Sequence, residues 1–415
     1  MNVLLVYPPS PFLENARCEP PLGIMYLAGA VDFYLRDRGV SVEILDLGDD
    51  QNYEATLTNR LKSKDYGVVG VSVVTPQYPY AVKLCEMVRE QSNAKLVVGG
   101  PHVSVLPNTV PHDVAVVGQG ERPFVEVVQD AMNGNDITGT IYASDYPRLP
   151  EPLWHPSREL VDLHGYSRKI SGVPATTLIT SWGCPNACRY CMRGTWDKFK
   201  MFSATYVTEE LRIINEDYGY KSVLFVDDTF TFDEDRLKLI CKDLKDRGMT
   251  WRCWTRVDRI NPELLAMMRD HGCMEISFGV ESGSQKLLDV MNKRTTVEMN
   301  KQALIWAKES GITTKAFLMV GIPGETRETV EETKKLISET NPDQFILSTF
   351  TPIVGSHVWH NPDDYGLINF DRMDFANQWE VGRGAAGGTL ISTDVLSSEE
   401  LKELRDEMLD FLRNR

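Results

Sequence analysis

The sequence predicts an α/β protein with two successive domains, each built around a parallel β-sheet. Short aliphatic runs alternate with amphipathic segments along most of the 415 residues, which is the pattern of repeated βα units. Glycine and proline gather where the aliphatic runs end, as they do in strand-to-helix turns. One proline-rich stretch divides the series into two parts, and about 150 residues per domain also favours two or three domains.

The first domain, residues 1–135, is expected to be a flavodoxin-like (Rossmann-like) doubly wound sheet. Its strands are predicted at Asn2–Tyr7, Ser41–Leu45, Val68–Val73, Lys95–Val98 and Val114–Val117, and its helices at Leu22–Arg36, Tyr53–Leu61, Tyr80–Glu90 and Arg122–Met132. In such open sheets the ligand binds at the carboxyl edge of the strands. The proline and glycine residues at that edge therefore mark a binding site, or else simple tight turns.

The second series of βα units predicts a partial (β/α)6 TIM barrel over residues 173–355. Residues 136–172 carry four prolines without clear periodicity and are expected to be a linker. The barrel strands are predicted at Thr176–Thr180, Ser222–Val226, Thr250–Thr255, Met274–Phe278, Thr314–Val320 and Asp343–Thr349. Residues 356–415 form a C-terminal, substrate-facing extension that ends in a charged helix from Ser397 to about Asn414, opened by a capping-box pattern.

Composition excludes several classes of protein. The chain has 44 Lys and Arg residues and 59 Asp and Glu residues, so its net charge is −15. This negative charge disfavours electrostatic binding of nucleic acid. The longest apolar runs, such as Val68–Val74, are far shorter than the ~20 residues that span a membrane. The first residues resemble a strand more than a signal peptide, and we expect a cytoplasmic protein.

Three of the eight cysteines stand within eight residues, directly after a predicted strand. Cys184, Cys188 and Cys191 have the spacing C-x-x-x-C-x-x-C. Three thiols cannot pair off as disulfides, and no neighbouring His or fourth Cys completes a structural zinc site. Three thiolates suit a 4Fe–4S cluster with one open iron. The other five cysteines, Cys18, Cys85, Cys241, Cys253 and Cys273, are expected to be buried and inert.

This spacing, with Tyr190 before the last cysteine, resembles the signature of the radical S-adenosylmethionine superfamily. The resemblance implies that the open iron binds the amine and carboxylate of S-adenosylmethionine. It also implies that an electron, supplied by a small ferredoxin or flavodoxin, cleaves the sulfonium and releases a 5′-deoxyadenosyl radical. Tyr190 would lie near the adenine.

Further S-adenosylmethionine contacts are implied at the ends of the later strands. Asp227 and Asp228 occupy the place of the superfamily's glycine–glycine–glutamate motif, although they depart from it, and would accept from the substrate ammonium. Val320 and Gly321 resemble the segment against which adenine packs. Arg256 would contact the carboxylate or, alternatively, form a surface ion pair with a neighbouring aspartate.

The segment Gly279–Ser284 after the fourth barrel strand resembles the stretch that binds ribose and carboxylate. Glu281 and Ser282 are its implied contacts. A helix cap is the alternative for its serines, Ser282 or Ser284 closing the first turn of the next helix.

The first domain resembles the cobalamin-binding domain that is fused to many radical enzymes. The implied cobalamin contacts are Pro8, Pro9, Ser72, Thr75, Gln77, Tyr78, Gly99, Gly100, His102, Gly118, Gln119, Gly120 and Glu121. The D-x-H-x-x-G motif that supplies a His to cobalt is missing, so a base-off corrinoid without a His ligand is expected. Gln77 and Tyr78 would lie beneath the corrin, and His102 would meet the nucleotide tail or merely cap a helix.

The two domains together imply a cobalamin-dependent radical C-methyltransferase of the class B type. Methylcobalamin would deliver a methyl group to an unactivated sp3 carbon after hydrogen abstraction, with two S-adenosylmethionines used per turnover and no protein group assigned a catalytic role. The substrate is a small molecule, a peptide or a protein side chain; resemblance to archaeal enzymes that modify methyl-coenzyme M reductase suggests a glutamine. A rearrangement or cyclisation without methyl transfer, and a non-catalytic corrinoid or cluster carrier, are the alternatives. A tRNA methylthiotransferase is disfavoured, because the first domain lacks a three-cysteine cluster of its own.

The segment Gly382–Gly388, with Arg383 and Trp379, either closes over the substrate or forms a surface loop.

Overall fold

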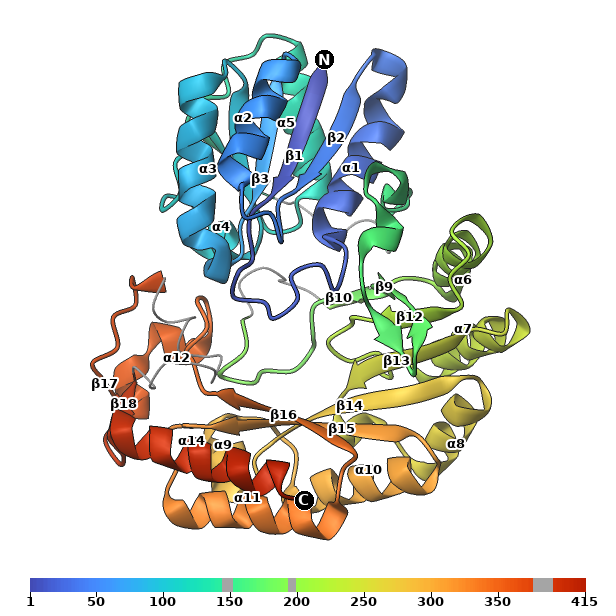
Figure 1. Cartoon of the computed structure of the whole chain (residues 1–415), viewed down its shortest axis with the longest axis vertical. Helices are drawn as coiled ribbons and strands as arrows, with labels where there is room; N and C mark the ends of the chain where they lie inside the picture. Colours follow the sequence, from blue (N-terminus) through green and yellow to red (C-terminus); the bar gives the residue numbers. More distant parts are fainter. Residues whose placement is uncertain (144–151, 193–198, 376–390) are drawn as a thin grey trace. The chain divides into compact units, whose positions relative to one another are not determined.

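The structure, a computed structural model, describes residues 1–143, 152–192, 199–375 and 391–415. The described residues up to Arg168 form one compact unit, and those from Lys169 onward form a second (Figure 1). Each unit is described by itself below. Trp379, Arg383 and the Gly382–Gly388 segment lie outside the described residues.

The first unit is a doubly wound parallel sheet with strand order β2-β1-β3-β4-β5-β6, as the sequence predicts. Its strands are β1 (Asn2–Tyr7), β2 (Ser41–Asp46), β3 (Val68–Ser72), β4 (Lys95–Gly99), β5 (Val114–Val117) and β6 (Thr140–Ala143). Its helices are α1 (Leu22–Leu35), α2 (Tyr53–Ser63), α3 (Tyr78–Gln91), α4 (Pro101–Val105) and α5 (Glu121–Met132). Helices α2 and α3 pack together and contribute to one core with the sheet, whereas α1 packs against α5. Loops at the carboxyl edge therefore converge between the two helical layers.

One strand and one helix of this unit were not predicted. The sixth strand, β6, extends the sheet beyond β5 by pairing Val114 with Thr140 and the residues that follow. Three of its four residues are exposed, so no alternation of apolar and polar residues reveals it. Helix α4 is five residues long, too short to show helical periodicity.

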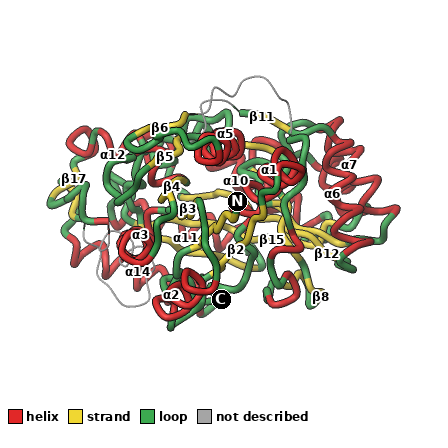
Figure 2. Tube along the Cα trace, turned by 90° about the horizontal axis from the view of Figure 1, so that it is seen from above, coloured by secondary structure: helices red, strands yellow, loops and turns green. Residues whose placement is uncertain are grey.

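The second unit contains the predicted partial barrel, six parallel strands in the order β16-β15-β14-β13-β12-β9. These strands are β9 (Thr176–Leu178), β12 (Ser222–Phe225), β13 (Thr250–Thr255), β14 (Cys273–Glu281), β15 (Thr313–Val320) and β16 (Gln344–Thr349). The helices are α6 (Ala204–Arg212), α7 (Glu234–Asp246), α8 (Pro262–Asp270), α9 (Gln285–Val290), α10 (Val297–Glu309), α11 (Arg327–Thr340), α12 (His357–His360) and α14 (Ser398–Arg413). Figure 2 shows the chain from above, with helices in red and strands in yellow.

Three two-stranded sheets complete the second unit. They are formed by β7 (Lys169–Ile170) with β8 (Val173–Pro174), β10 (Ser181–Trp182) with β11 (Lys200–Met201), and β17 (Leu367–Ile368) with β18 (Ser392–Thr393). The β7–β8 hairpin contacts β12 and β13, where Ile170 joins a small core with Leu224 and Trp254. The hairpin therefore packs on the face of the sheet opposite the helices.

The last helix, α14, begins as the sequence predicts. The Ser397 hydroxyl accepts from the Glu400 backbone N–H while the Glu400 carboxylate accepts from the Ser397 N–H, which is a capping box. Its buried Leu401, Leu404 and Met408 pack toward α11, β15 and β16. In the parts of the chain that the structure describes, no helix is both long and apolar enough to cross a membrane.

Candidate functional site

The three clustered cysteines lie on the loop that follows β10 in the second unit. Hydrogen-bond donors approach their sulfurs: Asn186 Nδ2 lies 3.3 Å from Cys184 Sγ, and Arg256 Nη1 lies 3.7 Å from Cys188 Sγ. The Thr229 hydroxyl lies 3.8 Å from Cys184 Sγ. Donors of this kind stabilise thiolates rather than neutral thiols.

These thiols fit an iron–sulfur cluster better than a single ion. No three His, Cys, Asp or Glu side chains of the described residues converge on a point that one metal ion would fill. A 4Fe–4S cluster instead takes its thiolates at separate corners. Cys188 is buried, whereas Cys191 is exposed. Desolvation by the surrounding protein raises the pKa of the Cys191 thiol to about 12, and the charges of Asp228 and of the other two thiols raise it further.

The remaining cysteines are withdrawn from solvent, as expected. Cys85, Cys241, Cys253 and Cys273 are buried, and Cys18 is half-buried. Burial raises the pKa of Cys85 to about 12, which keeps it a neutral thiol. The structure thus separates three thiols on one loop, two of which lie near side-chain donors, from five thiols outside that loop.

The two aspartates after β12 have different surroundings. Asp227 is fully buried, and its carboxylate accepts from the Thr180 N–H at 3.1 Å, from the Thr180 hydroxyl at 2.9 Å and from the Ser181 hydroxyl. These bonds join β12 to the segment that leads into the cysteine loop. Asp227 therefore has a structural role at this strand end, and its implied contact with the ammonium group stays a prediction. Asp228 reaches solvent beside Cys191 and remains the candidate carboxylate.

A buried cluster of three polar side chains lies at the end of β14. Lys293 Nζ donates to Glu281 Oε1 at 2.8 Å and to the Tyr190 hydroxyl at 2.9 Å, and Tyr190 in turn donates to Glu281 Oε1 at 3.1 Å. Burial and the Glu281 carboxylate together hold the pKa of Tyr190 well above its usual value. The cluster connects the tyrosine of the cysteine motif to the strand end that resembles the ribose-binding segment.

Lys293 was not predicted from the sequence. It follows α9 in a turn where Asn292 and Arg294 both have positive φ, and nothing in the local pattern separates it from Arg294 beside it. The structure shows the difference, since only about 6% of the Lys293 side chain is exposed. Glu281 itself has φ +62°, a backbone strain that occurs at functional sites.

Arg256 joins the cysteine loop to this cluster. Its guanidinium pairs with Asp258 at 2.8 Å and donates to the Lys293 carbonyl at 2.9 Å, besides approaching Cys188. The ion pair with Asp258 that the sequence left open is present, but Arg256 is only 5% exposed, so it is not a surface pair. Arg256 therefore lies at the candidate site and is held there by several partners.

The serines after Glu281 have structural contacts. Ser282 is fully buried, its hydroxyl lies 3.2 Å from that of Thr333 on α11, and it accepts from the Ser284 N–H at 3.0 Å. The Ser282 hydroxyl therefore joins this strand end to α11, and its implied ribose contact stays a prediction. Ser284 is the N-cap residue of α9 but makes no capping hydrogen bond through its side chain.

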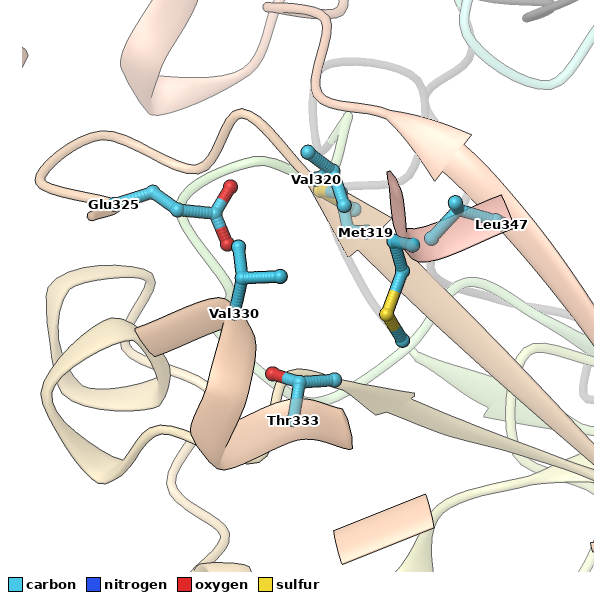
Figure 3. Close-up of a pocket in the computed structure, with 7 residues that line it drawn as sticks. Met319, Val320, Glu325, Val330, Thr333 and Leu347 are labelled. Carbon is cyan, nitrogen blue, oxygen red and sulfur yellow. The ribbon is translucent and has the colours of Figure 1, made fainter. Parts of the chain in front are cut away.

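The turn after β15 is held by a buried carboxyl group. Val320 ends the strand, and Gly321 follows with φ +92°, a conformation that favours glycine. The Glu325 carboxylate accepts from the Gly321 N–H. Figure 3 shows Glu325 at a small, mostly apolar recess, which is lined by Met319, Val320, Glu325, Val330, Thr333, Leu347 and Met408. This largely apolar setting raises the pKa of Glu325 to about 7.

Glu325 should make stability fall as pH rises. Its pKa is 4.5 unfolded and about 7 folded, so the stabilisation is fully present below 4.5 and is lost as pH rises through 7. One such group contributes a slope of up to about 1.4 kcal/mol per pH unit over that window. We expect Glu325→Gln to remove this slope from the pH dependence of the free energy of unfolding, measured by urea unfolding between pH 5 and 8. Exposed Glu399→Gln should leave the slope unchanged, and an unchanged slope in Glu325→Gln would show that the carboxyl ionises normally.

The carboxyl edge of the first unit forms a second candidate site. Ser104 links its two glycine turns, because its hydroxyl donates to the Gly100 carbonyl at 2.9 Å and accepts from the Gly118 N–H at 3.0 Å. Gly100 has φ +98°, and a Cβ there would meet the Val73 backbone at 2.9 Å. Ser72 and Gly99, which end β3 and β4, are paired in register at this edge.

His102 is not available to a ligand. It is fully buried, with Nδ1 3.2 Å from the Thr75 hydroxyl and Nε2 2.9 Å from the Thr109 hydroxyl. Burial lowers the pKa of His102 to about 4, so the ring is neutral. Both nitrogens are engaged within the domain, and the expected contact with a nucleotide tail stays a prediction.

The loop expected beneath the corrin is also tied to the protein. Gln77 is fully buried, and its Nε2 donates to the Pro8 carbonyl and the Ser10 hydroxyl, both at 2.8 Å. The Tyr78 hydroxyl donates to the Thr109 carbonyl at 3.0 Å. The Gln77 bonds link the turn after β1, where Pro8 and Pro9 stand, to the start of α3, and the Tyr78 bond links α3 to the loop after α4.

Three buried polar atoms at this edge have no hydrogen-bond partner among the described residues. They are Gln77 Oε1, Gln119 Nε2 and Glu121 Oε2. Glu121 opens α5 after Gly120, and burial raises the pKa of its carboxyl to about 7. Unpaired buried groups cost free energy, so they point to a polar ligand at the edge. A corrinoid, with its amide side chains and nucleotide tail, fits such a set of donors and acceptors.

Comparisons with known proteins agree with both sites. The model of the radical S-adenosylmethionine superfamily matches residues 178–337, and the B12 binding domain matches residues 14–128. An uncharacterised methyltransferase of Pyrococcus horikoshii is 30% identical over 399 residues, covering 89% of this chain and 84% of that protein. The anaerobic magnesium-protoporphyrin IX monomethyl ester cyclase of Rubrivivax gelatinosus is 28% identical over 90% of this chain and 72% of its own length.

A solved structure shares the fold of both units. The radical S-adenosylmethionine methyltransferase TsrM from Kitasatospora setae, with cobalamin and a [4Fe-4S] cluster bound, has a TM-score of 0.72 at 17% identity and covers 100% of this chain and 88% of that one. The two matched domains, the three-cysteine loop and the identity to a methyltransferase over most of both lengths lead to one conclusion. The chain is an enzyme of the cobalamin-dependent radical S-adenosylmethionine methyltransferase family.

Proposed function

We propose that this enzyme methylates an unactivated sp3 carbon of its substrate. The observation that carries the proposal is the pair of sites in one chain: a three-thiol loop in the second unit, with donors beside Cys184 and Cys188, and an edge in the first unit with buried polar atoms that lack partners among the described residues. When bound, the cluster would supply an electron to S-adenosylmethionine, and cobalamin would supply a transferable methyl group. A small ferredoxin or flavodoxin is the proposed electron donor.

Charged side chains of the second unit would bind the ammonium and carboxylate groups of S-adenosylmethionine. Asp228, beside Cys191, is the proposed acceptor for the ammonium group. Lys293 contacts Tyr190 and Arg256 approaches Cys188, and both cations are proposed to attract the carboxylate. Glu281, which holds Lys293, is placed to accept from the ribose hydroxyls. The turn at Val320 and Gly321, stiffened by Glu325, offers backbone for the adenine.

The first unit would hold cobalamin base-off, with no His on the cobalt. Support comes from His102, whose two ring nitrogens are engaged by Thr75 and Thr109. Gln119 and Glu121 would pair with the amides or the tail of the corrinoid through the atoms that lack partners in the described chain. Binding would then satisfy groups that cost free energy when left unpaired.

The test is an anaerobic reaction of the reconstituted enzyme with methyl-deuterated S-adenosylmethionine and mixtures of small metabolites or peptides. We expect mass spectrometry to find a product that carries the deuterated methyl group, formed together with 5′-deoxyadenosine. The glutamine substrate suggested by the sequence is tested by including glutamine-containing peptides. Cleavage of S-adenosylmethionine with no label in any product would contradict methyl transfer.

A cyclisation or rearrangement is the second candidate. The observation that favours it is the 28% identity to the cyclase of Rubrivivax gelatinosus over 90% of this chain. The same reaction separates the two functions, because a cyclisation consumes substrate and leaves the deuterated methyl group out of the product.

A further inference from the structure

Two side-chain donors are directed at sulfurs of the cysteine loop. Asn186 stands between the first two cysteines of the loop, and its Nδ2 lies 3.3 Å from Cys184 Sγ. Arg256 follows β13, 68 residues beyond Cys188 in the chain, and its Nη1 lies 3.7 Å from the Cys188 sulfur. The loop itself therefore supplies one donor, and the packed barrel supplies the other.

The guanidinium of Arg256 is held so that one nitrogen is left for sulfur. Its Nε and Nη2 donate to the two carboxylate oxygens of Asp258 at 2.8 and 3.0 Å, and Nη2 also donates to the Lys293 carbonyl at 2.9 Å. The remaining nitrogen, Nη1, faces Cys188 Sγ. A bidentate pair of this kind fixes the plane of the guanidinium, so it also fixes the direction of Nη1.

The burial of Arg256 and Cys188 favours a charged sulfur as the acceptor. Arg256 is 5% exposed and Cys188 is 8% exposed. A neutral thiol is a weak acceptor, so a buried guanidinium nitrogen that faced one would be poorly satisfied. A thiolate carries negative charge and accepts a stronger, charge-assisted hydrogen bond. The arrangement therefore suits Cys188 as a metal ligand better than Cys188 as a free thiol.

Hydrogen bonds to cysteine ligands act on the redox equilibrium of an iron–sulfur cluster. Reduction of a 4Fe–4S cluster adds one electron from the reductant, and no bond forms or breaks. The cysteine sulfurs share the added negative charge, so a donor beside them binds more strongly in the reduced state than in the oxidised state. Each such donor therefore raises the reduction potential of the cluster.

We propose that Asn186 and Arg256 raise the reduction potential of the 4Fe–4S cluster by donating hydrogen bonds to Cys184 and Cys188. The proposal rests on the proposed function, since it concerns the cluster that this loop would hold. Both side chains act through the cysteine ligands, so they are positioning residues and not catalytic residues. A higher potential lets the proposed electron donor, a small ferredoxin or flavodoxin, reduce the cluster more readily. Arg256 would thus serve the cluster through Nη1 and the S-adenosylmethionine carboxylate through its charge.

A redox titration of the reconstituted holoenzyme without S-adenosylmethionine tests the proposal. The titration follows the electron paramagnetic resonance signal of the reduced cluster. Asn186→Leu keeps the approximate size of the side chain and removes the donor to Cys184. We expect this change to lower the equilibrium constant for one-electron reduction about tenfold, which is a fall of about 59 mV in midpoint potential. The Asn186 side chain is half-buried on a loop, so we expect the fold to survive.

The donor on Arg256 is tested by a double variant. Arg256→Met alone would leave the Asp258 carboxylate unpaired, and its negative charge would itself lower the potential. Arg256→Met with Asp258→Asn removes one positive and one negative charge, so the net charge is kept while the donor to Cys188 is lost. We expect a fall in midpoint potential similar to that of Asn186→Leu. Iron content per chain is measured for each variant, and Asn186→Leu decides alone if the double variant takes up no iron.

Arg189→Met is the matched control. Arg189 belongs to the same loop, but its side chain is exposed and donates to the Val290 carbonyl at 3.2 Å instead of to a sulfur. Water and salt screen an exposed charge, so we expect the wild-type potential in this variant. Wild-type potentials in the donor variants, or an equal fall in Arg189→Met, would overturn the proposal and leave the proposed function standing. A wild-type enzyme that takes up no cluster would instead refute the proposed function.

Discussion

Replacing Cys184 by alanine is expected to abolish reductive cleavage of S-adenosylmethionine. With one of three thiolates missing, the 4Fe–4S cluster loses a corner ligand. We expect loss of the cluster's visible absorbance after anaerobic reconstitution and 5′-deoxyadenosine below detection. Cys188→Ala and Cys191→Ala should behave in the same way.

A matched cysteine gives the control. Cys18 is half-buried in the first unit and has no part in the loop, so Cys18→Ala should keep both the absorbance and the cleavage. Circular dichroism of each variant shows whether the fold survives. Retained cleavage in a folded Cys184→Ala enzyme would refute the assignment of the three thiols.

Replacing Lys293 by methionine is expected to weaken S-adenosylmethionine binding by about 100-fold. The change removes an ammonium that bonds both Glu281 and Tyr190 and leaves a carboxylate in a buried cluster without its cation. Removing one partner of a buried ion pair also destabilises the fold, by about 3–5 kcal/mol. Binding is measured by calorimetry with the reconstituted enzyme, and stability by urea unfolding.

A second variant separates the two effects. In Lys293→Met with Glu281→Gln, the buried charge is gone and much of the stability should return, but the affinity should stay low because the cation is still missing. Lys293→Arg keeps the charge and should retain part of the affinity. If the double variant regained both stability and affinity, Lys293 would serve the fold alone.

Much of the architecture could be predicted because it follows from local patterns of apolar and polar residues in the sequence. Buried parallel strands are short continuous aliphatic runs, and the helices between them have clear apolar faces, so both sheets could be inferred. The thiol loop could be found for a similar reason, since its three ligands are close in sequence. By contrast, β6 is exposed and short, and it lies within residues 136–172, which show no clear periodicity.

The details of the sites depend on contacts between distant residues. Asp227 and Asp228 are neighbours in sequence, yet Asp227 is taken up by Thr180 and Ser181, 47 and 46 residues away. His102 looks like a ligand after its glycine turn, but its partners Thr75 and Thr109 come from other loops. Lys293 meets Tyr190 across 103 residues. No local pattern reveals such pairings, because burial and hydrogen bonding are decided by the packed fold.

The most direct test of the account is methyl transfer to cobalamin in the absence of substrate. The enzyme, loaded with reduced cobalamin, is given S-adenosylmethionine labelled on the methyl carbon, and the corrinoid is then extracted and analysed by mass spectrometry. The account predicts labelled methylcobalamin bound to the protein, and a weaker yield in Glu121→Ala, which removes a buried polar group at the cobalamin edge. Cobalamin that binds but never acquires the label would contradict the assignment of this enzyme as a cobalamin-dependent methyltransferase.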